Sequence, residues 1–311
     1  MQKAKNTMVE RLFIGLQHIV PHHVLSRMAG RLAASEQGWV KDRLIRRFMR
    51  AYRINLAEAE QADGNYPSFN AFFTRALKPG ARPLAPADRF ILSPADGTIS
   101  QLGRIAAGRI IQAKGHDYSV TELLGGDAEQ ARRFHNGSFA TIYLAPSDYH
   151  RVHMAADGSL AHTTYLPGAL FSVNPVTAAA VPRLFARNER LACMFTGDVG
   201  HFAQVLVGAM IVAGMETVWA GPVKPHGKRI LKRDFTPAKT QTKTQARTEP
   251  ETQPASGGAQ APQLRAGDEM GRFLLGSTVV LLFEQDKVSW LPELGPGSRL
   301  LMGQAMANRS V

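Results

Sequence analysis

The sequence predicts an α+β protein, with amphipathic helices at the N-terminus and a β-rich core arranged as a sandwich or barrel. Three observations predict this class. The first 53 residues repeat apolar side chains at helical spacing. From residue 91 to residue 219, short runs rich in β-branched and aromatic residues are separated by Gly, Pro, Asp and Asn. Helical segments do not alternate regularly with these runs, so βαβ units are not expected.

Composition limits the size and class of the protein. The chain has 311 residues, 44% of them hydrophobic, which suffices for one large domain or two modest ones. Cys193 is the single cysteine, so an internal disulfide is excluded and a reducing compartment is expected. The longest apolar block, residues 205–215, is too short to cross a bilayer. The N-terminal apolar positions are periodic rather than continuous, so no cleavable signal peptide is expected.

Positive charge is concentrated at the N-terminus. The formal net charge is +12, and residues 1–53 contain eleven Lys and Arg against three Asp and Glu. This asymmetry indicates an anionic partner, either nucleic acid or a lipid surface. Zinc-finger spacing, RNP-like aromatic motifs and a helix-turn-helix signature are all missing from the sequence, so nucleic acid is disfavoured.

The N-terminal segment is predicted to form three helices. The first presents Met8, Leu12, Leu16 and Ile19 on one face and ends at Pro21, and the second covers residues 24–34. In the third, an apolar stripe faces away from a row of arginines: Val40, Leu44, Ile45, Phe48, Met49 and Tyr52 against Arg43, Arg46, Arg47 and Arg50. This helix either packs on the domain with a solvated basic face or lies among the headgroups of an anionic membrane.

The remaining elements follow in order. Ser68 is a predicted N-cap for a helix that holds Phe72 and Phe73. Strands are expected at residues 97–102, 109–113, 139–144, 160–165 and 202–211, with one helix at residues 177–186. The polar composition of residues 236–266 predicts a disordered insert. The expected organisation is a helical segment (1–60), a β-rich core (61–235), the insert (236–266) and a C-terminal part of the core (267–311).

Three clusters could carry chemistry. Gly276 and Ser277 interrupt an apolar run at residues 273–283, where a glycine usually marks a bulge or a close approach. Asp96 follows Ser93-Pro94-Ala95, and its simplest role is to bond its own backbone in a turn. His150 and His153 could share one pocket or be structural histidines. A zinc site is disfavoured because no Cys or Glu-rich partner stands at ligand spacing.

An Asp, a His and a Ser are the parts of a nucleophile relay, in which the carboxylate orients the imidazole and the imidazole takes the serine proton. Hydrolases usually flank that serine with glycines on both sides. Ser277 has only Gly276 before it, and the nearest carbonyl group belongs to Gly276 itself, so attack on the chain's own backbone is favoured. Two alternatives stay open: a serine hydrolase using Asp96, His153 and Ser277, and a non-enzymatic β-rich module that binds membranes.

Several motifs, in this order along nearly the whole chain, resemble the proteobacterial-type phosphatidylserine decarboxylases, which are pyruvoyl enzymes made as self-cleaving proenzymes. The motifs are residues 92–97 (LSPADG), 148–154 (DYHRVHM), 167–174 (PGALFSVN), 184–190 (LFARNER), 216–221 (ETVWAG) and 270–278 (MGRFLLGST). The sequence departs from the family in the insert at residues 236–266, which is longer than expected.

The resemblance implies a self-cleavage site and a cofactor. The chain would be cut between Gly276 and Ser277, with His153, held by Asp96, deprotonating Ser277. Ser277 would become a pyruvoyl group at the head of a small α chain (residues 277–311), and the large β chain would end at Gly276. No pyridoxal phosphate, nucleotide or metal is implied.

The resemblance also implies a reaction and partners. The pyruvoyl group would form a Schiff base with the amine of phosphatidylserine, lose CO₂ and release phosphatidylethanolamine. His150 is the candidate proton donor. Ser172 and Asn174 are candidate headgroup contacts, or ordinary polar groups of a turn. The protein would be peripheral, on an anionic membrane surface at the cytoplasmic side, and a homodimer, without nucleic acid.

Overall fold

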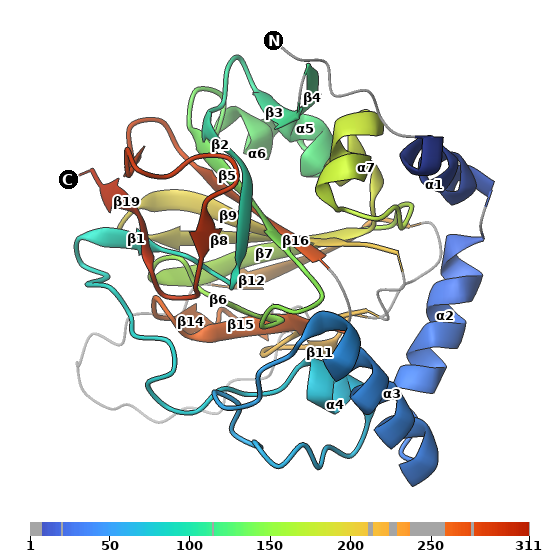
Figure 1. Cartoon of the computed structure of the whole chain (residues 1–311). Coiled ribbons are helices and arrows are strands. Elements are labelled where there is room, and N and C mark those ends of the chain that lie inside the picture. Colours follow the sequence, from blue (N-terminus) through green and yellow to red (C-terminus); the bar gives the residue numbers. More distant parts are fainter. Residues whose placement is uncertain are drawn as a thin grey trace, which may run out of the picture.

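The computed structural model describes residues 8–19, 21–113, 115–210, 214–223, 229–236, 259–274 and 277–310 (Figure 1). Antiparallel sheets dominate, and helices lie at the N-terminus, which confirms the predicted α+β class. The helices are α1 (Met8–Ile19), α2 (His22–Ala33), α3 (Gly38–Tyr52), α4 (Phe69–Phe73), α5 (Val120–Leu123), α6 (Ala128–Arg132), α7 (Pro175–Ala180) and α8 (Leu184–Arg187).

The largest sheet has ten strands and runs through the middle of the molecule. Its strands lie in the order β13 (Ala259–Gln260), β12 (Leu231–Thr236), β7 (Gly158–Leu166), β8 (Arg190–Gly197), β9 (Gly200–Gly208), β16 (Ser277–Phe283), β5 (Ser138–Leu144), β2 (Gly97–Arg104) and β18 (Arg299–Leu300), with β14 (Gln263–Leu264) beside β7. Apart from the parallel β12–β13 pair, the described neighbours in this sheet are antiparallel.

Three smaller sheets accompany it. One contains β11 (Gly221–Pro222), β10 (Met215–Thr217), β15 (Glu269–Phe273) and β6 (Arg151–His153). The second contains β1 (Phe90–Leu92), β19 (Ala305–Arg309) and β17 (Val288–Trp290), and the third is the pair β3 (Arg109–Ala113) and β4 (His116–Ser119).

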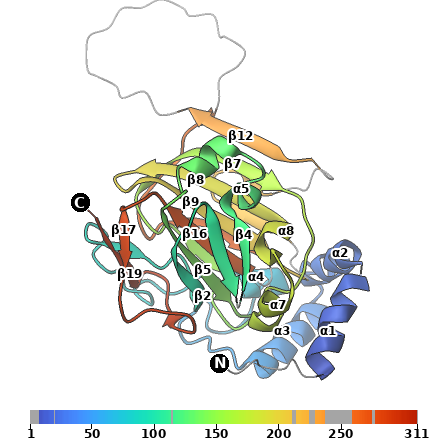
Figure 2. The ribbon, with the colours of Figure 1, turned by 90° about the horizontal axis from the view of Figure 1, so that it is seen from above.

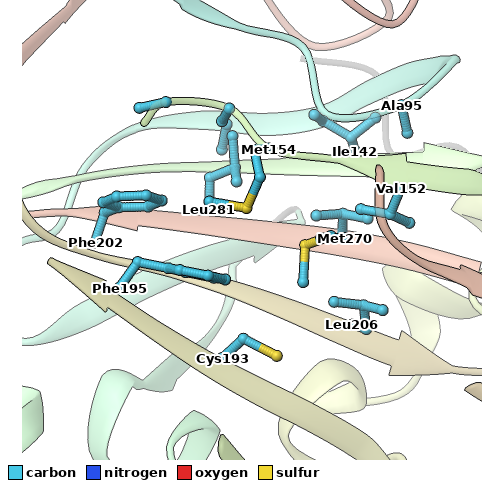
Figure 3. Close-up of a cluster of buried hydrophobic side chains, with 14 of the residues drawn as sticks. Ala95, Ile142, Val152, Met154, Cys193, Phe195, Phe202, Leu206, Met270 and Leu281 are labelled. Atoms are coloured by element: carbon cyan, nitrogen blue, oxygen red, sulfur yellow. The ribbon is translucent and has the colours of Figure 1, made fainter. Parts of the chain in front are cut away.

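Strand β16 lies between the two halves of the hydrophobic core. All seven of its residues are buried, and it pairs along its full length with β9 on one side and β5 on the other. Because side chains alternate along a strand, Leu281 enters one core cluster and Leu282 the other. Figure 3 shows the first cluster, where Met270 of β15 and Val152 of β6 lie with Leu206 of β9. The second cluster lies under α5, α7 and α8.

The N-terminal helices run along one side of the core, as two views at right angles show (Figures 1 and 2). Ile45 of α3 is buried in a cluster with Phe69, Phe72 and Phe73 of α4, where the predicted N-cap Ser68 accepts a hydrogen bond from the Ala71 amide. The apolar stripe of α3 therefore packs on the protein, while its arginines stay exposed: Arg43, Arg46, Arg47 and Arg50.

The structure differs from the sequence expectation in two places. The helix predicted at residues 177–186 is two short helices, because Pro182 lacks an amide hydrogen and holds Val181 in an extended conformation. Within the predicted insert, strands β13 and β14 occupy residues 259–260 and 263–264. The prediction for residues 237–258 falls outside the described residues.

Candidate functional site

Ser277 is the first residue of β16 and lies opposite Leu144 of β5 and Gly208 of β9. Its side chain is fully buried, and its Oγ has no hydrogen-bond partner among the described residues. A buried hydroxyl without a partner costs about 1–3 kcal/mol. The site therefore holds a polar atom that the fold itself does not satisfy. Leu275 and Gly276, and with them the bond predicted to be cut, lie outside the described residues.

A tight turn after β5 brings His150 to the same end of the sheet. The Asp148 amide donates to the Ala145 carbonyl, and the Ala145 amide donates to the Asp148 carboxylate. The Asp148 carbonyl lies 2.8 Å from Nδ1 of His150 and can only accept, so Nδ1 carries the proton and Nε2 carries a lone pair. The turn thus fixes the tautomer of His150.

The His150 ring is enclosed. It is fully buried, its centroid lies 4.0 Å from that of Phe73, and Nε2 has no hydrogen-bond partner among the described residues. Desolvation lowers the pKa of His150 to about 3, despite the opposing hydrogen bond that Nδ1 donates to the Asp148 carbonyl. At neutral pH, Nε2 is therefore an uncharged buried base.

The segment that leads to Ser277 passes directly beside His150. The Phe273 amide donates to the His150 carbonyl at 3.0 Å. This bond continues the antiparallel pairing of β15 with β6, the strand that follows His150. Phe273 stands four residues before Ser277. The main chain therefore places Ser277 and the imidazole at one end of the central sheet.

His153, at the end of β6, has partners for both ring nitrogens. Nδ1 lies 2.7 Å from the Gly267 carbonyl, so this nitrogen is protonated, and Nε2 accepts a hydrogen bond from the Tyr149 hydroxyl at 3.0 Å. Desolvation lowers the pKa of His153, and the hydrogen bond to Gly267 opposes the shift. His153 is also a neutral base, but its lone pair is engaged by Tyr149.

Asp96 lies near His153 but bonds elsewhere. The His153 amide donates to the Pro94 carbonyl at 2.7 Å, which aligns the two segments. The buried Asp96 carboxylate accepts hydrogen bonds from Nε of Arg82 at 2.9 Å, from Nη2 of Arg82 at 2.6 Å and from the Met302 amide at 2.8 Å. The structure brings Asp96 and His153 into one neighbourhood without a hydrogen bond between these two side chains.

Asn174 has a local contact, and Ser172 contacts the first helix. The Asn174 side chain accepts from the Thr177 amide and caps α7. The Ser172 amide donates to the Gln17 side chain of α1 at 2.8 Å. Their loop reaches the site through Asn188, which is fully buried and donates to the carbonyls of Phe171 and of Gly208, the cross-strand neighbour of Ser277.

Sequence reasoning missed several residues around these groups. Tyr149 stands in the same motif as the histidines, directly before His150 and four residues before His153, and this spacing could have suggested its contact with His153. Arg82 binds Asp96, and Arg299 binds Asp148 through two hydrogen bonds, but both arginines are distant in the sequence from their partners. No local pattern connects them.

The arrangement suits proton transfer at a backbone serine. It places a buried hydroxyl and two neutral imidazoles at one end of the sheet, and β9 and β5 hold Ser277 on both sides. A carbonyl group made from Ser277 would stay where the two neighbouring strands place it. Among the described residues, no group of three or more His, Cys, Asp or Glu side chains is arranged to hold a metal ion.

Comparisons with known proteins cover nearly the whole chain. Residues 69–308 match the phosphatidylserine decarboxylase family model, and residues 12–53 match a model described as PSD. The chain is 51% identical over 306 residues to the phosphatidylserine decarboxylase proenzyme of Stutzerimonas stutzeri (strain A1501), covering 98% of this chain and 96% of that protein. It is 52% identical to the proenzyme of Ectopseudomonas mendocina (strain ymp), covering 97% and 99%. It is 51% identical to that of Azotobacter vinelandii (strain DJ / ATCC BAA-1303), covering 98% and 100%. The chain therefore belongs to the phosphatidylserine decarboxylase family.

Proposed function

We propose that Ser277 is the residue at which this phosphatidylserine decarboxylase proenzyme cuts itself and from which its pyruvoyl group is made. Family membership makes the chain a carboxy-lyase precursor that acts in phospholipid biosynthesis. The observation that supports the assignment to Ser277 is its buried Oγ, which has no hydrogen-bond partner among the described residues, at the start of a strand paired on both sides.

The first step is acyl transfer within the backbone. His153 takes the Ser277 proton through Nε2, after that nitrogen releases the Tyr149 hydroxyl, and Oγ attacks the Gly276 carbonyl. The amide between Gly276 and Ser277 becomes an ester. Asp96 assists electrostatically, since its negative charge favours protonation of His153.

The second step breaks the ester. Loss of the Ser277 α-proton expels the Gly276 carboxylate and leaves dehydroalanine at the head of the new chain. Its tautomer takes up water and loses ammonia, which leaves a pyruvoyl group on residues 277–311. The large chain ends at Gly276. β16 keeps the small chain in the core, because its pairing with β5 and β9 does not depend on the cut bond.

The pyruvoyl carbonyl supplies the electron sink that lets a serine headgroup lose CO₂. His150 then accepts and donates the proton that the reaction transfers. Its Nε2 is an uncharged base in the precursor, so it first takes a proton from the substrate ammonium. After CO₂ has left, the same nitrogen returns that proton to the substrate Cα. The enclosure by Phe73 excludes water from this transfer.

The substrate is a lipid, so the N-terminal helices are proposed as the membrane contact. No helix in the described part of the chain has the length and apolar character to cross a bilayer. The stripe predicted on α1 is exposed rather than packed, with Leu12 74% and Ile19 81% accessible. The exposed arginines of α3 would attract anionic lipids. We further propose attachment at the cytoplasmic side and a homodimer, as the resemblance implies.

The test is a denaturing gel with intact mass of protein purified from cells. We expect a fragment of residues 277–311 whose N-terminus is blocked to Edman degradation, and an uncut Ser277→Ala variant. A serine hydrolase would instead keep its full mass and react with a serine-directed acylating probe. A membrane-binding module would keep its full mass and react with neither that probe nor a hydrazine.

A further inference from the structure

Arg75 differs from the other arginines around the site because it lacks a carboxylate partner. Arg82 pairs with Asp96, Arg299 with Asp148, and Arg151 with Glu269, at distances between 2.5 and 2.7 Å. Arg75, just after α4, forms no ion pair within 4.0 Å among the described residues. Its side chain is nevertheless buried, with 6% of the residue accessible.

Two donor nitrogens of Arg75 are also unsatisfied. Nε and Nη1 are buried and have no hydrogen-bond partner among the described residues. The contact that fixes the group is with an aromatic ring, since Cζ lies 5.5 Å from the centroid of Phe72. Burying a guanidinium without hydrogen bonds is costly, so buried arginines normally face a carboxylate, a phosphate or carbonyl groups. The fold therefore holds a buried cation that has two unsatisfied donor nitrogens and, among the described residues, no carboxylate in direct contact.

Arg75 lies beside the proposed reaction site. Phe72, which it covers, and Phe73, which packs on the His150 ring, are neighbours in α4. The positive charge of Arg75 also contributes to lowering the pKa of His150, so the two groups are electrostatically coupled. An anion bound by Arg75 would therefore lie close to the atom that His150 protonates.

We propose that Arg75 binds the phosphodiester of the substrate headgroup. This assignment rests on the proposed function. The headgroup carries two anionic groups, a phosphodiester and a carboxylate, and the phosphorus atom is three bonds from the Cα that His150 reaches. A cation on the carboxylate would stabilise a charge that disappears as CO₂ leaves, and so would slow the reaction. The phosphodiester keeps its charge throughout, so binding it does not raise the barrier.

The experiment measures amine capture by the mature two-chain enzyme. The enzyme is incubated with increasing concentrations of glycerophosphoethanolamine or 2-methoxyethylamine, and cyanoborohydride reduces the imine that each amine forms. The mass of the small chain gives the fraction captured, and hence the amine concentration at half-saturation. In the wild type we expect glycerophosphoethanolamine, which carries the phosphodiester, to reach half-saturation at a concentration at least 30-fold lower than 2-methoxyethylamine. Arg75→Gln should bring the two amines within about 3-fold of each other, and Arg75→Lys should be intermediate. Arg104→Gln, a change at an exposed arginine, should match the wild type.

The outcomes separate this inference from the proposed function. A wild-type enzyme that is uncut or captures neither amine would refute the proposed function. If the Arg75→Gln enzyme keeps the wild-type preference for glycerophosphoethanolamine, the role of Arg75 is overturned and the proposed function is not affected. With phosphatidylserine as substrate, we expect Arg75→Gln to raise KM at least 30-fold with kcat within about 3-fold, because the interaction is the same before and during the reaction. A fall in kcat at unchanged KM would also overturn the assignment. That result would instead indicate a carboxylate contact or a structural role.

Discussion

Arg299 donates two hydrogen bonds to the Asp148 carboxylate, from Nη2 at 2.5 Å and from Nη1 at 3.1 Å. With the proposed cut before Ser277, Arg299 would belong to the small chain and Asp148 to the large one. Asp148 is almost fully buried, and its carbonyl accepts a hydrogen bond from Nδ1 of His150. The pair therefore connects the proposed small chain to the turn that orients the proposed proton donor.

Replacing Arg299 should weaken that turn. Arg299→Leu leaves the buried Asp148 charge without its cation, and because Arg299 is itself half-exposed, water replaces part of the interaction. We expect a loss of about 2 kcal/mol in the free energy of unfolding, with Arg299→Lys intermediate. Urea unfolding in the uncut Ser277→Ala background measures it. Arg104→Leu, which removes an exposed pair with Asp286, serves as the control and should change little.

His150 and His153 should separate cutting from decarboxylation. His153→Ala removes the proposed base and should leave the chain uncut. His150→Asn retains a donor for the Asp148 carbonyl but not Nε2, so it should be cut and then decarboxylate at least 100-fold more slowly. Gel analysis and CO₂ release distinguish the two steps. Efficient cutting of His153→Ala, or full activity of His150→Asn, would remove that residue from its assigned step.

Stability should fall in acid because of His150. Its pKa is about 3 in the folded protein and about 6.5 in an unfolded chain, so below pH 6.5 protonation favours the unfolded state. The Ser277→Ala precursor should lose up to about 1.4 kcal/mol per pH unit through this group between pH 6 and pH 4. The precursor that also carries His150→Asn lacks that component. If the urea midpoints of the two proteins fall by the same amount as the pH is lowered, the burial of a neutral imidazole at position 150 is contradicted.

Cutting itself should tolerate mild acid. The reaction needs neutral His153, whose pKa is lowered by desolvation, so its rate should remain constant as pH falls to 6.5 and decline only at lower pH. Pulse-labelled precursor, translated in vitro and shifted to buffers of different pH, gives the rate. A decline centred above pH 6.5 would indicate that a different base controls the step.

Vesicle binding should depend on the exposed stripe of α1. Deleting residues up to Arg53 would be a poor test, since Ile45 of α3 is part of a core cluster. Changing Leu12, Leu16 and Ile19 together to Ser removes exposed apolar surface without touching that cluster. We expect at least a 10-fold loss of affinity for anionic vesicles with unchanged self-cleavage. As a matched control, the exposed Ile111 of β3 changed to Ser should bind normally.

The sequence predicted the helices and strands better than the side-chain contacts between residues that are far apart in the chain. The strand around Val280 and the cap at Ser68 follow from local pattern, and so does the placement of both histidines after β5. The break at Pro182 was missed, although a proline inside a helical pattern is a local signal. The hydrogen bonds of Asp96 with Arg82 and of Asp148 with Arg299 could not be predicted, because they join residues that only tertiary packing brings together. The isolated donors of Arg75 were beyond prediction for the same reason.

The double pairing of β16 has a consequence for the life of each molecule. A strand enclosed between β9 and β5 cannot be withdrawn and replaced by a fresh copy while the sheet remains intact. If a reductant converts the ketone to an alcohol, the damaged strand cannot be exchanged for one with an intact ketone. Lost activity can be restored only by synthesising another full-length chain, so each polypeptide makes its ketone once and cannot renew it.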